Sequence, residues 1–167
     1  MRRAVFPGTF DPITYGHTDI IERGSKVFEE LIVAVAVNPA KSTLFSIEER
    51  KELITKLTAG MPNVRVDSFA GMTVDYVRSI GARIILRGMR TMSDFENEFQ
   101  MALSNRVFCK EVETVFLMTS VERSFLSSHR IKEVAALGAD VSALVPEIVY
   151  RKLQEKLKSG ALKSVKP

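Results

Sequence analysis

Short apolar runs alternate with helical patterns along the chain, and this alternation restricts the fold more than any other feature of the sequence. Residues 31–37 read LIVAVAV, and such a run is typical of a strand covered on both faces of a parallel sheet. Four further apolar runs predict strands at residues 4–6, 64–69, 82–86 and 114–118. Parallel neighbours need crossover connections, so helices are expected between these strands.

Helical patterns do occupy the intervals. Ser46 and Glu49 have the spacing of a capping box ahead of an apolar stripe, which predicts a helix up to about Leu57. Other helices are predicted near residues 14–28, 74–80, 91–107, 128–137 and 146–158. The expected fold class is therefore α/β, a Rossmann-like, doubly wound sheet of five parallel strands with helices on both faces. A chain of 167 residues suits one such domain, which we place at residues 1–158, and we expect residues 159–167 to form a poorly ordered basic tail.

Composition and charge disfavour several other classes of protein. The longest apolar run is far too short to span a bilayer, and prolines at 7 and 12 interrupt any signal-like segment, so we expect a cytoplasmic protein without a membrane partner. Cys109 is the single cysteine, which excludes an intrachain disulfide and a CxxC metal site. The net charge of +4 comes partly from the last helix and tail, which carry no aromatic residue after Tyr150. Nucleic-acid surfaces usually interleave aromatic and basic residues, so no nucleic-acid partner is expected.

Candidate functional residues follow the predicted strands. Open parallel sheets bind ligands at the carboxyl ends of their strands. The residues expected there are Gly8, Thr9, Phe10, the TYGH segment at 14–17, Lys41, the RGMR segment at 87–90, and residues 120–129. One histidine, one lysine and two arginines thus meet beside helix N-termini. Fixed cations and free backbone N–H groups in such a place predict a polyphosphate site.

Each of these residues also has a purely structural interpretation. The glycines at 8 and 16 could only form turns, His17 could simply begin a helix, and Lys41 could be a solvated loop residue. Arg87 and Arg90 could form weak surface ion pairs with the carboxylates at 94 or 96.

Two local conflicts favour the functional interpretation. Glu98 lies beside the apolar stripe formed by residues 92, 95, 99 and 102, and no cation occupies its neighbouring helical positions at 94 and 102. Arg130 and Lys132 fall in the first turn of the helix that Ser127 and Ser128 are expected to cap, where the helix dipole disfavours cations. An anion bound at that helix end would remove the second conflict.

These residues together closely resemble the motifs of the phosphopantetheine adenylyltransferases, bacterial enzymes that make dephospho-CoA. They belong to the nucleotidyltransferase superfamily defined by a T/H-x-G-H motif, here TYGH at 14–17. The resemblance runs from about residue 5 to residue 157. Its matching segments are PGTFDP at 7–12, Lys41, FSIEER at 45–50, RGMR at 87–90, DFE-x-E at 94–98 and SFLSS at 124–128.

The resemblance implies roles for individual residues. ATP would be bound by Thr9, Phe10, His17, Gly88, Met89, Arg90, Glu98, Arg123, Ser124, Phe125, Leu126, Ser127, Ser128 and His129. The acceptor, 4′-phosphopantetheine, would be bound by Thr9, Lys41, Thr73 and Arg87. His17, Lys41 and Arg90 would be catalytic, with His17 stabilising the transition state. The family often has a third Ser or a Thr after the serine pair, where this chain has His129.

The implied reaction is a reversible transfer of the adenylyl group of ATP to 4′-phosphopantetheine, giving dephospho-CoA and pyrophosphate. The acceptor phosphate is largely a dianion near neutral pH because its second pKa is about 6. It is already a nucleophile, so direct in-line attack needs neither a general base nor a covalent intermediate. The resemblance further implies Mg²⁺ as cofactor without side-chain ligands of its own, a homohexamer, and inhibition by CoA.

Other functions stay open at this point. The nearest alternative is adenylyl or cytidylyl transfer to another phosphorylated acceptor, such as nicotinamide mononucleotide. A non-catalytic sensor of adenine nucleotides is an alternative of a different class, although His17, Lys41 and Arg87 together favour turnover.

Overall fold

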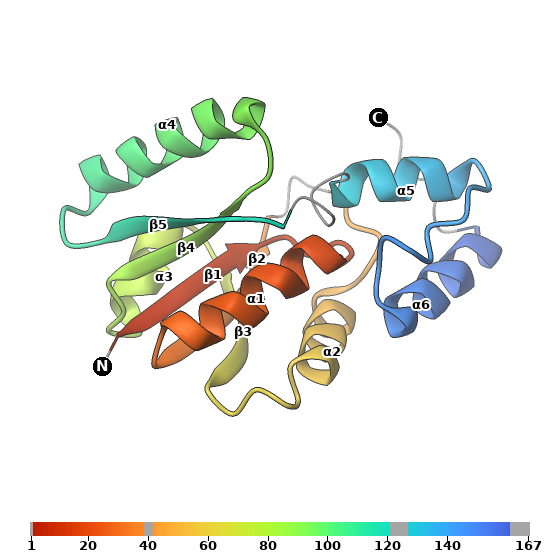
Figure 1. The fold of residues 1–167 in the computed structure, drawn as a ribbon, viewed down its shortest axis with the longest axis horizontal. Helices are drawn as coiled ribbons and strands as arrows, with labels where there is room; N and C mark the ends of the chain where they lie inside the picture. The colour runs from red at the N-terminus through yellow and green to blue at the C-terminus, as the bar shows by residue number, and fades with distance from the viewer. Residues whose placement is uncertain (1, 39–41, 121–126, 161–167) are drawn as a thin grey trace.

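The computed structural model describes residues 2–38, 42–120 and 127–160, and it contains a five-stranded parallel sheet (Figure 1). The strands lie in the order β3-β2-β1-β4-β5. Their bounds are β1 Arg3–Gly8, β2 Glu30–Val37, β3 Val64–Ala70, β4 Ile84–Met89 and β5 Glu113–Met118. This confirms the predicted doubly wound α/β sheet. In this order the chain reverses its direction of winding between β1 and β4, which is where such sheets open a crevice.

Helices cover both faces of the sheet, as predicted. They are α1 Tyr15–Val27, α2 Ile47–Leu57, α3 Thr73–Ser79, α4 Met92–Phe108, α5 Ser128–Ala136 and α6 Glu147–Lys158. Helices α1 and α2 pack on one face and α3 and α4 on the other, while α5 and α6 lie beyond the carboxyl ends of the strands (Figure 1). No helix in the described ranges is both long and apolar enough to cross a membrane.

Strand β2 shows why its sequence is apolar throughout. Leu31, Val33 and Val35 join the core beneath α1 and α2, whereas Ile32 and Ala34 join the core on the side of α3. Successive side chains of a strand point to opposite faces, so a strand covered on both sides must be apolar at every position. The central place of β2 between β1 and β3 therefore accounts for the LIVAVAV run.

Strands β1 and β4 separate toward their carboxyl ends. Their register contains only the pairs Ala4↔Ile84 and Val5↔Ile85, although β1 continues to Gly8 and β4 to Met89. Pro7 lacks an N–H, and its carbonyl oxygen accepts a hydrogen bond from Arg87 Nη1 at 2.9 Å. A strand residue directs its N–H and C=O to the same side, so the missing donor is the one that would have faced β4. We call the place where β1 and β4 part, after the pair Val5↔Ile85, the crevice between these strands, and the loss of pairing there follows from the sequence of β1.

Strand β4 is longer than predicted. We expected it to end at Leu86 and the RGMR segment to follow it, but Arg87, Gly88 and Met89 belong to the strand. Pairing with β5 continues through Met89↔Met118, so the strand does not end at Gly88. A Cβ at residue 88 would lie 2.9 Å from Ile20 Cγ1, so the glycine serves the close packing of α1 on the sheet.

The prediction for the apolar stripe of α4 was wrong. Phe95 and Phe99 stack on each other with ring centroids 5.6 Å apart, and they are 41% and 47% exposed. The side of the helix next to these rings directs Asp94 and Glu98 toward Arg90 and Arg87 at the end of β4. Ion pairs therefore hold this helix to the sheet, and its apolar residues face outward.

The contact of α1 with the sheet leads to a prediction about stability. A Cβ added at Gly24 would lie 2.7 Å from Leu86 and 3.2 Å from Leu31, both fully buried. We expect Gly24→Ala to be destabilising, because overpacking a core costs about 1–3 kcal/mol and the gain in helix propensity is at most about 1 kcal/mol. Gly60→Ala is the matched control, because a Cβ there meets no atom of the described chain within 4 Å. Urea unfolding of both variants measures the difference, and equal stability would contradict the proposed close packing.

Candidate active site

His17 lies in the first turn of α1 and is held by Thr14, the residue that caps this helix. Its Nδ1 accepts a hydrogen bond from the backbone N–H of Thr14 at 3.1 Å and lies 3.0 Å from Thr14 Oγ1. The hydroxyl of Thr14 in turn accepts from the backbone N–H of His17 at 3.4 Å, completing a capping box. Because Nδ1 is an acceptor, the proton of the neutral ring is on Nε2. The TYGH segment thus fixes both the orientation and the tautomer of His17.

The surroundings of His17 keep its ring neutral. Desolvation lowers its pKa to about 4, and the positive charges of Arg90 and Arg87 contribute to the shift. The ring also meets the edge of Phe10 with centroids 5.1 Å apart. At neutral pH His17 is therefore a hydrogen-bond donor through Nε2 and not a cation.

Thr9 and Phe10 form the loop between β1 and α1. The carbonyl oxygen of Thr9 accepts a hydrogen bond from Arg50 Nη1 at 2.9 Å. Phe10 has a positive φ of 50°, and its side chain is buried, so any contact of Phe10 with ATP would involve its backbone. The ring of Phe10 occupies the space where a Cβ of Gly8 would lie, 2.8 Å from the nearest ring carbon. Gly8 is thus required by the packing of Phe10.

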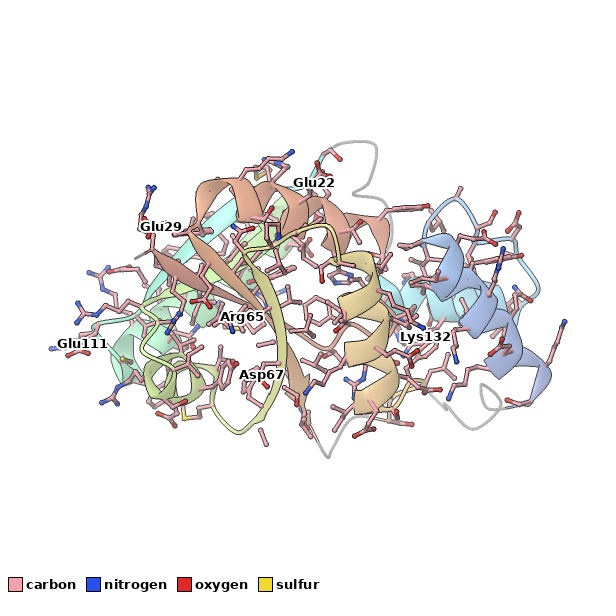
Figure 2. The ribbon with its side chains drawn as sticks, turned by 90° about the horizontal axis from the view of Figure 1, so that it is seen from below. Glu22, Glu29, Arg65, Asp67, Glu111 and Lys132 are labelled. Carbon is pink, nitrogen blue, oxygen red and sulfur yellow. The ribbon has the colours of Figure 1, made fainter. Side chains whose placement is uncertain are left out.

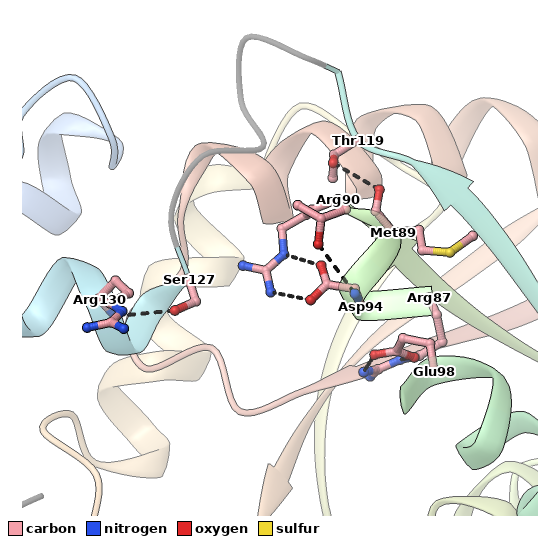
Figure 3. A network of polar contacts seen from close by, with 9 residues as sticks. Arg87, Met89, Arg90, Asp94, Glu98, Thr119, Ser127 and Arg130 are labelled. Atoms are coloured by element: carbon pink, nitrogen blue, oxygen red, sulfur yellow. Dashed lines mark hydrogen bonds and ion pairs between the residues drawn. The ribbon is translucent and has the colours of Figure 1, made fainter. Parts of the chain in front are cut away.

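Arg87 is bound from two sides at the crevice between β1 and β4, and Figure 3 shows the side on which it meets Glu98. Its Nε and Nη2 donate to Glu98 at 2.8 and 2.5 Å, and its Nη1 donates to the carbonyl oxygen of Pro7. Glu98 therefore has a partner across the structure that helical spacing could not indicate. The bidentate pair fixes the guanidinium plane of Arg87 in the crevice.

Arg90 forms a second pair of the same kind. Its Nε and Nη2 donate to Asp94 at 3.0 and 3.3 Å, and Thr91 caps α4 by accepting from the backbone N–H of Asp94 (Figure 3). The ion pair with residue 94, which the sequence analysis gave as a structural interpretation of Arg90, is therefore present. Asp94 and Glu98 are one helical turn apart, so one side of α4 holds both arginines.

The start of α5 also faces this region. Ser127 caps the helix by accepting from the backbone N–H of Arg130 at 3.3 Å, and Ser128 Oγ donates to the carbonyl oxygen of Pro12 at 2.8 Å. Glu133 lies 3.2 Å from His129 and 2.9 Å from Arg130. Carboxylates of the chain itself already pair with Arg130 and Lys132, so the conflict in this turn does not require a bound anion, and anion binding here stays a prediction.

The structure brings together only part of the predicted site. Thr9, His17, Arg87, Gly88, Met89 and Arg90 flank the crevice between β1 and β4. Thr73 is the first residue of α3 and follows β3, two strands away from β1. Lys41, Arg123, Ser124, Phe125 and Leu126 lie outside the described residues. Their roles, like the other ligand assignments, stay predictions.

Three charged residues of the sequence motifs and of α5 are buried beneath the site, which the sequence analysis did not predict. Asp11, Arg50 and Lys132 are 4%, 4% and 8% exposed. A sequence signal existed for Lys132, because it shares a helical stripe with Ile131 and Ala135, which pack in the core. A lysine on such a stripe needs a buried partner.

Comparison with known proteins agrees with this geometry. Residues 5–134 match the model of the cytidylyltransferase-like family. A phosphopantetheine adenylyltransferase of Caldanaerobacter subterraneus subsp. tengcongensis is 53% identical over 160 residues, covering 96% of this chain and all of the relative. One of Syntrophus aciditrophicus is 55% identical over 153 residues, covering 92% of this chain and 93% of the relative.

Solved structures share the fold at much lower identity. A putative nicotinate-nucleotide adenylyltransferase of Vibrio parahaemolyticus superposes with a TM-score of 0.66 at 18% identity, covering 92% of this chain and 99% of that one. A bifunctional NMN adenylyltransferase/ADP ribose pyrophosphatase of Francisella tularensis gives 0.68 at 16% identity, covering 96% of this chain and 51% of that one. From the family model and the near full-length relatives together, the chain belongs to the cytidylyltransferase-like family and, within it, to the phosphopantetheine adenylyltransferases.

Proposed function

We propose that this chain transfers the adenylyl group of ATP to 4′-phosphopantetheine, forming dephospho-CoA and pyrophosphate. The observation that carries the proposal is the crevice between β1 and β4, where the Nε2–H of His17 and the guanidinium groups of Arg87 and Arg90 come together. The names of relatives with 53–55% identity favour phosphopantetheine as acceptor. The two solved structures support the fold alone and favour no acceptor.

The chemistry needs positioning and charge stabilisation. An oxygen of the acceptor phosphate attacks the α-phosphorus of ATP, a bond forms between them, and the bond from that phosphorus to the pyrophosphate oxygen breaks. His17 donates its Nε2–H to the phosphate oxygens on which charge develops, and Arg90 stabilises the same charge. Arg87 and Lys41 place the acceptor phosphate. His17 accepts no proton in this mechanism, which suits a neutral ring.

The arginines retain donors for phosphate while they remain paired. A guanidinium has five N–H donors, and the bonds of Arg87 to Glu98 and Pro7 use three of them. Among the contacts of Arg87 with described residues, two of its N–H groups therefore have no acceptor and are available to a phosphate. A phosphate can bind these two N–H groups without breaking the ion pair. Glu98 would therefore assist acceptor binding by holding Arg87, in addition to its predicted contact with ATP.

Mg²⁺ would enter this site with ATP. The described residues contain no group of three or more His, Cys, Asp or Glu side chains suited to hold a metal. Mg²⁺ at nucleotide sites commonly keeps several waters and binds substrate phosphates, which agrees with a site built from arginines and backbone N–H groups. When bound, the ion would neutralise the triphosphate, while His17 and Arg90 orient it.

Assembly, location and regulation form a further part of the proposal. Helix α4 exposes large apolar side chains in the single chain, with Phe95, Phe99, Leu103 and Val107 four residues apart along one stripe and 41%, 47%, 50% and 77% exposed. Such a face supports a homo-oligomer, which we propose to be the homohexamer implied by the sequence motifs. We also propose a cytoplasmic enzyme, and competition by CoA, because CoA contains both the adenylyl and the phosphopantetheine parts of the product.

The acceptor can be tested directly. With ATP and Mg²⁺, we expect 4′-phosphopantetheine to release pyrophosphate, and pantetheine to be inert because the missing phosphate is the nucleophile. Nicotinamide mononucleotide should react at a small fraction of that rate. Pyrophosphate release measured with each acceptor decides the point, and comparable turnover of nicotinamide mononucleotide would refute the acceptor assignment.

His17→Ala tests the transition-state role. We expect kcat to fall by about 10²–10³, the usual cost of losing one well-placed donor, with little change in KM for either substrate. Ser46→Ala breaks the capping box of α2 at its N-cap residue and serves as control for the loss of a cap, with a loss of about 0.5–2 kcal/mol in stability and normal kcat. Recovery of wild-type turnover by His17→Ala at saturating substrate would show that the residue only binds ATP.

The pKa of His17 also predicts how stability depends on pH. In the unfolded chain the ring binds a proton below about 6.5, whereas in the folded chain its pKa is about 4. Between these values the unfolded state binds more protons, so the unfolding free energy must fall as pH falls from 6.5 toward 4. We expect urea unfolding of His17→Asn to show a shallower decline in this window. Parallel declines for the two proteins would contradict the neutral state of His17.

A further inference from the structure

A buried ion pair joins the loop that follows β1 to helix α5. Lys132 Nζ donates to Asp11 Oδ2 at 2.5 Å, and both residues are less than a tenth exposed. Asp11 directly follows Thr9 and Phe10, and Lys132 lies one turn after Ser128, on the side of α5 toward α2 (Figure 2). The pair therefore connects two segments predicted to bind ATP.

The same carboxylate holds a third segment. Asp11 accepts hydrogen bonds from the backbone N–H groups of Leu44, at 3.0 Å to Oδ2, and Phe45, at 2.8 Å to Oδ1. These two amides lie between residue 41 and the start of α2. Two further bonds tighten the junction, from Arg50 to the carbonyl oxygen of Thr9 and from Ser128 to that of Pro12.

Stability alone does not account for this arrangement. Replacing a buried ion pair by apolar residues of similar size is often neutral or stabilising, because removing two charges from water offsets much of their attraction. Lys132 stands between Ile131 and Ala135 on the buried side of α5, where an apolar residue would continue the core. What the ion pair adds is a defined position of α5 relative to the loop at residues 9–12, because its short bonds are directional whereas apolar packing is not.

We propose that Lys132 and Asp11 are positioning residues for the two substrates. Lys132 fixes the N-terminal end of α5 against the loop of Thr9 and Phe10, and so acts on ATP. Asp11 acts on ATP through Lys132, and on the acceptor through the backbone of residues 44 and 45, which follow Lys41 closely in the sequence. This inference rests on the proposed adenylyl transfer, and it assigns no contact with substrate to either residue.

The substitution Lys132→Met removes the charge and keeps an unbranched side chain of similar length. We expect KM for ATP, and Kd for ATP with Mg²⁺ by calorimetry, to rise about tenfold or more, since a displacement of about 1 Å can cost up to 10²-fold. KM for the acceptor should change by no more than about twofold, because the bonds from Asp11 to residues 44 and 45 do not involve Lys132. The melting temperature should fall because Asp11 keeps a buried charge without its partner.

The double variant Asp11→Asn/Lys132→Met separates positioning from stability. Removing both charges should raise the melting temperature above that of Lys132→Met, whereas ATP binding should stay weak because the link is still absent. KM for the acceptor should now rise as well, since an amide cannot accept both backbone bonds as the carboxylate does. This variant also keeps the test intact if Lys132→Met alone does not fold.

Lys156→Met is the matched control. Lys156 donates to Glu49 at 2.8 Å and ties α6 to α2, without a bond to the loop at residues 9–12. ATP affinity should be unchanged in this variant. The inference is overturned if Lys132→Met binds ATP like the wild type, or if ATP affinity in the double variant recovers together with the melting temperature. Absence of pyrophosphate release by the wild type would refute the proposed function instead, and calorimetry with ATP would still test Lys132.

Discussion

The pairing of β1 with β2 on one side and with β4 on the other is the constraint on which the site depends. Pairing with β2 continues along the whole of β1, whereas pairing with β4 ends after Val5. The resulting crevice lies where the order of the sheet reverses, and Arg87 enters it to bind the carbonyl oxygen of Pro7. The proline therefore has two effects, since it removes a donor from the ladder and leaves an acceptor that positions a guanidinium. Both effects come from one residue of the PGTFDP segment.

A second principle is that the cations of the site are compensated within the chain. Arg87 pairs with Glu98, Arg90 with Asp94, and Lys132 with Asp11. Paired side chains lose their freedom on folding, so a substrate that binds them later need not order them again. The cost is that each carboxylate also repels the phosphates. The donors that the arginines retain beyond their ion pairs offset this cost, and their fixed geometry is what charge stabilisation in a transition state requires.

The sequence predicted those features of the fold that local physical chemistry determines. The five parallel strands, the capping box of Ser46 and the helix start at the TYGH segment were all confirmed, because periodicity and capping involve residues close in sequence. The end of β4 and the orientation of α4 were not, because pairing with β5 and the Arg87–Glu98 bond join residues from separate elements. Asp11 and Lys132 were missed for the same reason, since 121 positions separate them. The sequence allowed an ion pair between Arg90 and Asp94, whereas only the structure showed that Arg87 pairs with Glu98.

The neutral state of His17 suits a site that binds the transition state more tightly than the substrates. A cation at this position would attract the triphosphate of bound ATP about as strongly as the transition state, and such uniform binding does not raise kcat. The interaction of a neutral donor is short-ranged, so it depends mainly on the charge of the oxygen that it contacts and strengthens as charge develops on that oxygen. The Thr14 amide fixes the tautomer, and the nearby arginines help to keep the ring unprotonated, so the donor is oriented before the reaction begins. In the proposed reaction the arginines would supply much of the attraction for phosphates, and His17 would distinguish the transition state from the ground state.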